Sequence, residues 1–158
     1  MRKRNAMDSA ARESTTRNYR DRLDRFKNGP AVAQVSAEGQ LFRFAKLTEI
    51  ANMSGQSILD IGCGIGDLYP FLRSRFDHVR YSGIDIVPEL ISAATLRFPD
   101  VPFRCEDILG PLRAGEPRAD WALMSMMFNN NLPHDNGAFL RDMVSAAFSL
   151  AGRGLAFN

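Results

Sequence analysis

The sequence predicts an α/β fold in which helices cover both faces of a doubly wound, mostly parallel sheet. Three observations predict it. Short apolar runs alternate with stretches of helical spacing, which is typical of repeated strand–helix units. The run 119–125 is apolar almost throughout, as in a strand buried on both faces. A glycine-rich turn joins a strand to a helix near residue 62. At 158 residues, one compact unit is expected.

Two helices are predicted ahead of the first strand. Residues 8–26 contain few helix breakers and carry apolar side chains at steps of three and four, and the tripeptide 28–30 ends this helix. A second helix is predicted over 37–52, with its apolar side chains on one face. The expected organisation is an N-terminal helical cap over 1–55 and a sheet-containing core over 56–158.

The most informative stretch reads Ser-Ile-Leu-Asp-Ile-Gly-Cys-Gly-Ile-Gly-Asp, from Ser57 to Asp67. A short strand over 58–61 runs into three alternating glycines, after which helical spacing resumes. Glycines let a ligand approach the main chain, and the N terminus of the next helix points unpaired N–H groups at the same place. The turn therefore predicts a ligand held against backbone, with a tight turn that binds nothing as the alternative.

The glycine spacing selects the kind of ligand. A dinucleotide loop, Gly-x-Gly-x-x-Gly, would need a third glycine where Asp67 stands. The observed acid-x-Gly-x-Gly-x-Gly resembles motif I of the class I S-adenosylmethionine-dependent methyltransferases of the small-molecule type. The resemblance implies a Rossmann-like fold with strand order 3-2-1-4-5 and S-adenosylmethionine as the cofactor. It assigns five residues of the turn to that cofactor: Asp60, Gly62, Cys63, Gly64 and Gly66.

A second acid follows the second predicted strand. This strand, 79–85, ends on Asp85, and the carboxyl ends of neighbouring parallel strands share one edge of a sheet, where ligands bind. A carboxylate there can accept both hydroxyls of a ribose, and the resemblance assigns Asp85 that contact. The alternative is a cap for the helix predicted over 88–98.

The third predicted strand, 101–105, leads to a position that matches the family's motif III. The resemblance gives Asp107 the role of accepting from the adenine amino group, with Ile86 and Ile108 as apolar walls beside the ring. An exposed turn carboxylate is the alternative for Asp107.

The strand 119–125 corresponds by resemblance to motif IV, which faces the transferable methyl group. Ser125 is expected to contact the cofactor, and Phe128 and Asn129 the substrate, although asparagine favours turns without any ligand. The Asn/Asp-Pro-Pro-Tyr tetrapeptide of nucleic-acid amino-methylating enzymes is absent from this position, so a nucleic-acid acceptor is disfavoured. From the N-terminal helices, Tyr19 and Arg43 are candidates to reach the substrate; core contact and surface charge are their alternatives.

Methyl transfer needs alignment and exclusion of water, and a base only when the acceptor carries a proton. His134, after the fourth strand, is the histidine placed to act as that base, with a solvated rim position as the alternative. Cys63 lies in a turn at a helix N terminus, which can lower a thiol pKa, although the resemblance makes it a small filler. The cysteines and histidines show no metal-ligand spacing.

The last helix is predicted over 136–150, with Gly152 as its stop, and a fifth strand over 153–158. The family's usual fold adds two further strands, so the fold is expected to be shortened at its C-terminal side. The outer edge of the fifth strand would then be open, and a homo-oligomer through that edge is one expectation.

Composition narrows the classes further. The chain is 45% hydrophobic and 24% charged with a net charge of +2, ordinary for a globular domain. The basic excess lies in residues 1–27, where charges of both signs alternate as on a solvated helix face. No apolar run reaches the length of a membrane span, so a cytoplasmic protein is expected. The predicted function is methyl transfer to a small molecule; the alternative is a shortened cofactor-binding module without turnover.

Overall fold

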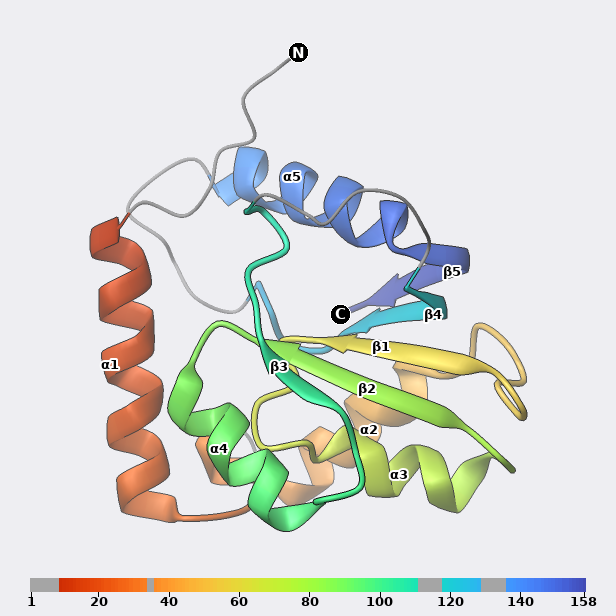
Figure 1. The fold of residues 1–158 in the computed structure, drawn as a ribbon, viewed down its shortest axis with the longest axis horizontal. Helices are drawn as coiled ribbons and strands as arrows, with labels where there is room; N and C mark the ends of the chain where they lie inside the picture. Colours follow the sequence, from red (N-terminus) through yellow and green to blue (C-terminus); the bar gives the residue numbers. More distant parts are fainter. Residues whose placement is uncertain (1–8, 34–35, 111–117, 129–135) are drawn as a thin grey trace.

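Five parallel strands form one sheet in the order β3-β2-β1-β4-β5. The structure is a computed structural model that describes residues 9–33, 36–110, 118–128 and 136–158 (Figure 1). The order confirms the predicted α/β class and topology. The strands are β1 (Ser57–Ile61), β2 (Arg80–Asp85), β3 (Phe103–Cys105), β4 (Ala119–Met124) and β5 (Ala151–Phe157).

Helices lie on both faces of the sheet. Figure 1 shows α5 over one face, α2, α3 and α4 toward the other, and α1 beside the edge at which the strands end. No helix in the described part of the chain is both long enough and apolar enough for a membrane crossing. The helices are α1 (Ser9–Phe26), α2 (Ala37–Leu47), α3 (Leu68–Arg75), α4 (Pro88–Arg97) and α5 (Asn136–Ser149), with one 3-10 turn, η1 (Pro30–Ala33).

Each face of the sheet has its own apolar cluster. The neighbours Ile58 and Leu59 are both fully buried but belong to different clusters, because successive strand side chains point to opposite faces. Leu59 packs in the cluster that contains Phe139 and Met143 of α5. Ile58 packs in the cluster that contains Phe44 of α2. The sheet is therefore covered on both faces, which explains why the central strand β4 is apolar almost throughout.

Helix α1 is attached to the rest of the molecule by a narrow apolar edge. Tyr19, Leu23 and Phe26 pack against a cluster that includes Val87 and Leu90, at the start of α4. An ion pair between α1 and α4 adds to this contact, with 2.6 Å between Arg20 and Glu89. The thin apolar stripe read from the sequence is thus the docking face of the helix.

Three predicted boundaries are wrong by two residues or more, and one of them is the start of β3, which lies at Phe103 rather than at residue 101. Helix α2 ends at Leu47 rather than at residue 52, and the hydroxyl of Thr48 donates to the carbonyl of Phe44 at 2.9 Å where the helix closes. Gly152 does not stop the last helix. That helix ends at Ser149, and β5 begins at Ala151, so Gly152 is the second residue of the strand. Pairing with β4 extends the strand past the glycine, which shows tertiary context overriding a local stop signal.

Candidate functional site

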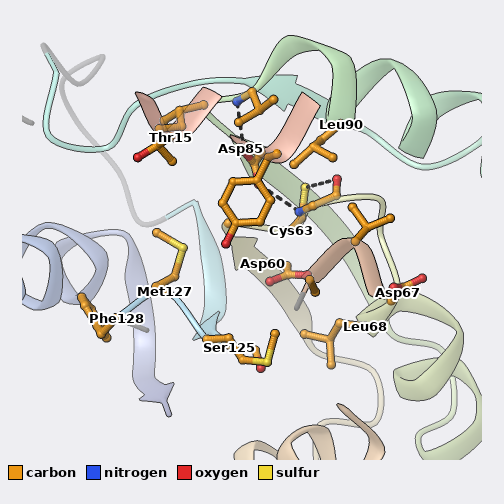
Figure 2. Close-up of a pocket in the computed structure, with 18 of the residues that line it drawn as sticks. Thr15, Asp60, Cys63, Asp67, Leu68, Asp85, Leu90, Ser125, Met127 and Phe128 are labelled. Carbon is orange, nitrogen blue, oxygen red and sulfur yellow. Dashed lines mark hydrogen bonds between the residues drawn. The ribbon is translucent and has the colours of Figure 1, made fainter. Parts of the chain in front are cut away.

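A cavity of about 370 Å³ opens at the carboxyl edge of the sheet (Figure 2). Its walls come from α1, α2, the glycine turn, the ends of β1, β2 and β4, and the start of α5. Parallel α/β sheets bind ligands at this edge. The lining contains most of the residues predicted to bind cofactor or substrate: Tyr19, Asp60, Gly62, Cys63, Gly64, Asp85, Ile86, Ser125 and Phe128.

The three glycines of the turn all have positive φ, at +75° for Gly62, +54° for Gly64 and +81° for Gly66. The space that an added side chain would meet differs among the three glycines. A Cβ on Gly62 would overlap the sulfur of Met127, and one on Gly66 would lie 2.9 Å from the ring of Phe103. A Cβ on Gly64 would meet nothing within 4 Å. Gly64 is therefore the glycine of the turn whose main chain is left open to a ligand, and Gly66 serves packing.

Asp85 fixes the glycine turn from the neighbouring strand. Its Oδ2 accepts from the backbone N–H of Gly64 at 2.9 Å, and its Oδ1 accepts from that of Val87 at 3.0 Å. Val87 is the N-cap residue of α4, and no side-chain hydrogen bond caps this helix, so the capping alternative is not supported. Burial raises the pKa of Asp85, and the N–H groups of Val87, Gly64 and Ile86 oppose that rise. Each oxygen keeps further acceptor capacity.

Asp60 is the second buried acid of the cavity. It has one described hydrogen-bond donor, the hydroxyl of Tyr81, at 2.6 Å from Oδ2. Burial raises the pKa of Asp60 to about 7, the Tyr81 hydrogen bond opposes the rise, and the carboxylates of Asp85 and Asp67 add to it. The surroundings of Asp60 therefore disfavour its charged form.

A polar bridge joins three elements beside the cavity. Asp67 accepts from Arg97 of α4 at 2.8 Å and from Nε2 of Gln40 of α2 at 3.2 Å, and Arg97 also donates to the carbonyl of Ile65 at 2.6 Å. The sequence reasoning missed Gln40. The signal available was a polar residue one turn before Phe44 on an otherwise apolar helix face.

A second, smaller cavity of about 50 Å³ adjoins the first. Its lining includes Ile86, Asp107 and Ile108, the three residues predicted to surround an adenine ring. Asp107 accepts from the N–H of Leu109 at 2.9 Å and pairs with Arg12 of α1 at 3.4 Å. Gly62, Asp85, Ile86, Met127 and Phe139 line both cavities. The predicted residues are thus brought together in two adjoining spaces.

Cys63 is not activated by its position. Burial raises the pKa of its thiol well above the ordinary value, and the nearby carboxylates of Asp60 and Asp85 add to the rise. The expectation of a lowered pKa from the helix N terminus is wrong, because desolvation outweighs it. The side chain instead fills space against β2, where a Cβ on Gly83 would come within 2.8 Å of its sulfur.

Four predicted residues lie outside both cavities or outside the described chain. Arg43 is not among the lining residues; its carbonyl accepts from the side chain of Asn158 at 2.9 Å. Gly66 does not line the cavity either. Asn129 and His134 fall in 129–135, outside the described residues. Among the residues that the structure describes, no three His, Cys, Asp or Glu side chains are grouped to hold a metal ion.

Residues 58–147 match a protein family described as a methyltransferase domain. This match covers more than half of the chain. The chain belongs to the methyltransferase domain family. The resemblance to class I S-adenosylmethionine-dependent methyltransferases is thereby confirmed, and S-adenosylmethionine is the family's cofactor, as predicted.

Curated relatives agree with this membership. A Mycobacterium tuberculosis protein named as a methyltransferase is 33% identical over 111 residues, which are 65% of this chain and 61% of that protein. The malonyl-[acyl-carrier protein] O-methyltransferase of Acetivibrio thermocellus is 39% identical over 84 residues, 52% of this chain and 29% of that enzyme. The chain thus matches less than two thirds of the length of either relative.

A solved structure supports the fold. The magnesium protoporphyrin IX methyltransferase of Synechocystis PCC 6803, solved with S-adenosylmethionine bound, matches 97% of this chain and 76% of that one, with a TM-score of 0.65. At 19% identity, this likeness shows the fold alone. It confirms the predicted Rossmann-like architecture.

Proposed function

We propose that this chain binds S-adenosylmethionine and transfers its methyl group to a small-molecule acceptor. The proposal rests on one observation at Gly64. This glycine lines the larger cavity with its side-chain position open, and its N–H donates to the buried carboxylate of Asp85. The larger cavity, about 370 Å³, falls within the range of small-molecule sites, roughly 300 to 1,000 Å³. The residues present fit the family's cofactor.

The proposed cofactor contacts follow from the two cavities. The carboxylate of Asp85 would accept the ribose hydroxyls with its remaining lone pairs. Asp107 would accept from the adenine amino group between Ile86 and Ile108, in the smaller cavity. The main chain around Gly64 would face the amino-acid tail. Met127 lines both cavities and lies over Gly62, so its side chain would have to adapt to the bound nucleoside.

When bound, the cofactor supplies a methyl group on a sulfonium sulfur, which a nucleophile displaces in line. The protein's part is to align the acceptor and keep water out, which can lower the barrier by several kcal/mol, on the order of 7 to 11 for ideal alignment. Tyr19 and Phe128, which line the cavity from α1 and from the end of β4, are the proposed acceptor contacts. His134 is the proposed base for an acceptor that carries a proton.

The proposed binding mode is tested by a matched pair of glycine variants. Gly64 and Gly55 both have positive φ, +54° and +72°, and both have an open side-chain position, but only Gly64 lines the cavity. Alanine at either position costs about 1 kcal/mol of backbone strain. In isothermal titration with S-adenosylmethionine, Gly64→Ala should lose at least about tenfold in affinity, whereas Gly55→Ala should bind like the wild type. Equal affinities in the two variants would contradict the binding mode.

Turnover is tested separately. Release of S-adenosylhomocysteine is measured across a panel of acceptors with the wild-type chain and with a His134→Gln variant. Cofactor binding with no release on any acceptor would favour the second candidate, a cofactor-binding module without turnover. The observation behind that candidate is the outer edge of β5, which pairs with no further strand among the described residues.

We propose three further properties of the chain, which concern its domain organisation, its location and its association. Residues 1–55 would act as a helical cap over the 56–158 core, and the protein would work in the cytoplasm. Copies of the chain would associate through the outer edge of β5, where Phe157 is 45% exposed. Light scattering checks the last point: a monomer at all concentrations would exclude it.

A further inference from the structure

Gln40 is a polar residue on the buried face of α2. Its side chain lines the larger cavity, and the residue is only 7% exposed. The other buried residues of this helix, Phe44 and Leu47, are apolar. Burying an amide costs folding free energy unless the group is hydrogen-bonded. The hydrogen bonds of Gln40 therefore indicate what this side chain does.

The amide of Gln40 is oriented by a carboxylate. Its Nε2 donates to Oδ2 of Asp67 at 3.2 Å, and Oδ1 of Asp67 accepts from Arg97 at 2.8 Å. Because an ionised carboxylate only accepts hydrogen bonds, the amino group of the amide faces Asp67 and the carbonyl oxygen, Oε1, is turned away from it. Within the described residues, Gln40 makes this one side-chain hydrogen bond. Its Oε1 therefore remains an acceptor for a ligand in the cavity.

Gln40 lies at the end of the larger cavity that is away from the predicted adenine site. Neither Gln40 nor its partner Asp67 is among the described residues that line the smaller cavity, which holds Asp107. Asp85, the proposed ribose contact, lines both cavities, as does Met127. Figure 2 shows Asp67 across the pocket from Met127. A nucleoside with its base in the smaller cavity and its ribose at Asp85 would therefore extend its tail toward Gln40.

The chemistry of S-adenosylmethionine matches an acceptor at this end. In the proposed binding mode, the adenine amino group donates to Asp107 and the ribose hydroxyls donate to Asp85. The remaining donor of the cofactor is the ammonium group of its amino-acid tail, and hydrogen bonds from a charged donor are the stronger ones. An ammonium group has three N–H bonds. It can donate to Oε1 of Gln40 and keep N–H groups for Asp60, which lines the same cavity.

We propose that Gln40 binds the amino-acid tail of S-adenosylmethionine, with its Oε1 accepting from the ammonium group. This inference rests on the proposed function and adds a cofactor-binding residue to the same site. Asp67, which is itself held by the ion pair with Arg97 of α4, fixes the amide in the orientation that this contact needs. Helix α2 would thus take part in cofactor recognition as well as covering the sheet.

A series of truncated ligands tests the contact in the wild-type chain. S-Adenosylhomocysteine carries the whole tail, its deamino analogue lacks the ammonium group, its decarboxy analogue lacks the carboxylate, and 5′-methylthioadenosine lacks both. In isothermal titration, the deamino analogue should bind at least about tenfold more weakly than S-adenosylhomocysteine. Equal affinities of these two ligands would overturn the inference without any variant.

A Gln40→Met variant tests whether Gln40 makes this contact. Methionine has a similar length without the amide, and Asp67 keeps its ion pair with Arg97, so the fold should persist. The variant should lose at least about tenfold in affinity for S-adenosylhomocysteine and for the decarboxy analogue, which both carry the ammonium group. It should lose no more than about twofold for the deamino analogue and for 5′-methylthioadenosine.

Gln56→Met is the matched control. Gln56 is not among the described residues that line either cavity, so this variant should bind all four ligands like the wild type. Thermal unfolding establishes whether both variants are folded. If Gln40→Met is not, the ligand series on the wild-type chain decides alone.

The two proposals fail differently. If neither S-adenosylhomocysteine nor 5′-methylthioadenosine binds the wild-type chain, the proposed function is wrong. If they bind, three results with folded Gln40→Met would overturn the inference and leave the proposed function standing. These are unchanged affinities, an equal loss for all four ligands, and a loss confined to the ligands that carry the carboxylate.

Discussion

Aspartates at the two edges of the sheet lie in opposite environments, and their pKa values are shifted in opposite directions. At the carboxyl edge, Asp60 and Asp85 are buried, and burial raises the pKa of both. At the amino edge, Asp120 accepts from the backbone N–H of Ser57 at 2.8 Å and from its hydroxyl at 2.7 Å. These hydrogen bonds lower the pKa of Asp120, and Arg153 contributes further.

This difference between the aspartates indicates that the amino edge of the sheet has a structural role and the carboxyl edge a functional one. Asp120 is satisfied by donors and pairs with Arg80 and Arg153 at 3.7 and 3.5 Å, so it fastens β4 to β1. Asp60 has a single described hydrogen-bond donor, and burial destabilises the charged form of its carboxyl group. Buried groups held at such a disadvantage are concentrated at functional sites. The predictions below test this division, from the largest expected effect to the smallest.

The largest effect is expected at Asp85. Asp85→Ala removes a charged acceptor of the proposed ribose contact and the anchor of Gly64. The affinity for S-adenosylmethionine should fall by more than tenfold, since hydrogen bonds to a charged group contribute roughly 1.5 to 3 kcal/mol. Titration calorimetry measures this loss, and Asp120→Ala, at the opposite edge, is the control with unchanged affinity. Unaltered binding by folded Asp85→Ala would refute the ribose assignment.

The next effect is a pH dependence of folding that originates at Asp60. Unfolded, this carboxyl titrates near 3.8; folded, its pKa is raised to about 7. Between these values the folded state binds more protons, so the free energy of unfolding should decrease as pH rises, by up to roughly 1.4 kcal/mol per pH unit. Asp60→Asn should flatten this slope in urea titrations from pH 4.5 to 8. Parallel slopes in variant and wild type would contradict the raised pKa.

Asp120 should give a smaller effect of opposite sign. Its lowered pKa means that it stabilises the fold above about pH 4 and that this contribution is lost as pH falls through the folded value. At neutral pH, Asp120→Ala should cost about 1 kcal/mol for the lost hydrogen bonds to Ser57. Chemical denaturation measures this cost. A variant with reduced cofactor affinity but unchanged stability would reverse the roles given to the two edges.

The smallest effect is expected at Cys63. Because burial keeps its thiol neutral, alkylation by iodoacetamide in the native state should modify the exposed Cys105 first. Peptide mass spectrometry follows both sites. Cys63→Ala should change cofactor affinity by no more than about twofold; faster alkylation of Cys63 than of Cys105 would indicate an activated thiol.

The features of the fold that depend on local sequence patterns were predicted correctly. The glycine turn and the position of Asp85 beside it followed from spacing, because parallel strands bring their carboxyl ends to one edge, whereas the strand order followed from the family resemblance. Properties that depend on packing were not accessible in this way. The bridge from Gln40 to Asp67 depends on how α2 docks, and the pKa of Cys63 depends on burial rather than on its helix terminus. The end of α5 was displaced by the pairing of β5 with β4.

The position of β1 between β2 and β4 has a consequence for biosynthesis. Ser57 and Asp120, whose hydrogen bonds fasten β1 to β4, are separated by 63 residues, so a nascent chain can join the first two or three strands long before the fourth leaves the ribosome. Contacts of such long sequence separation form slowly. The wall contributed by Met127 and Phe128 follows β4 in the chain, so this side of the cavity forms only after β4 has paired with β1.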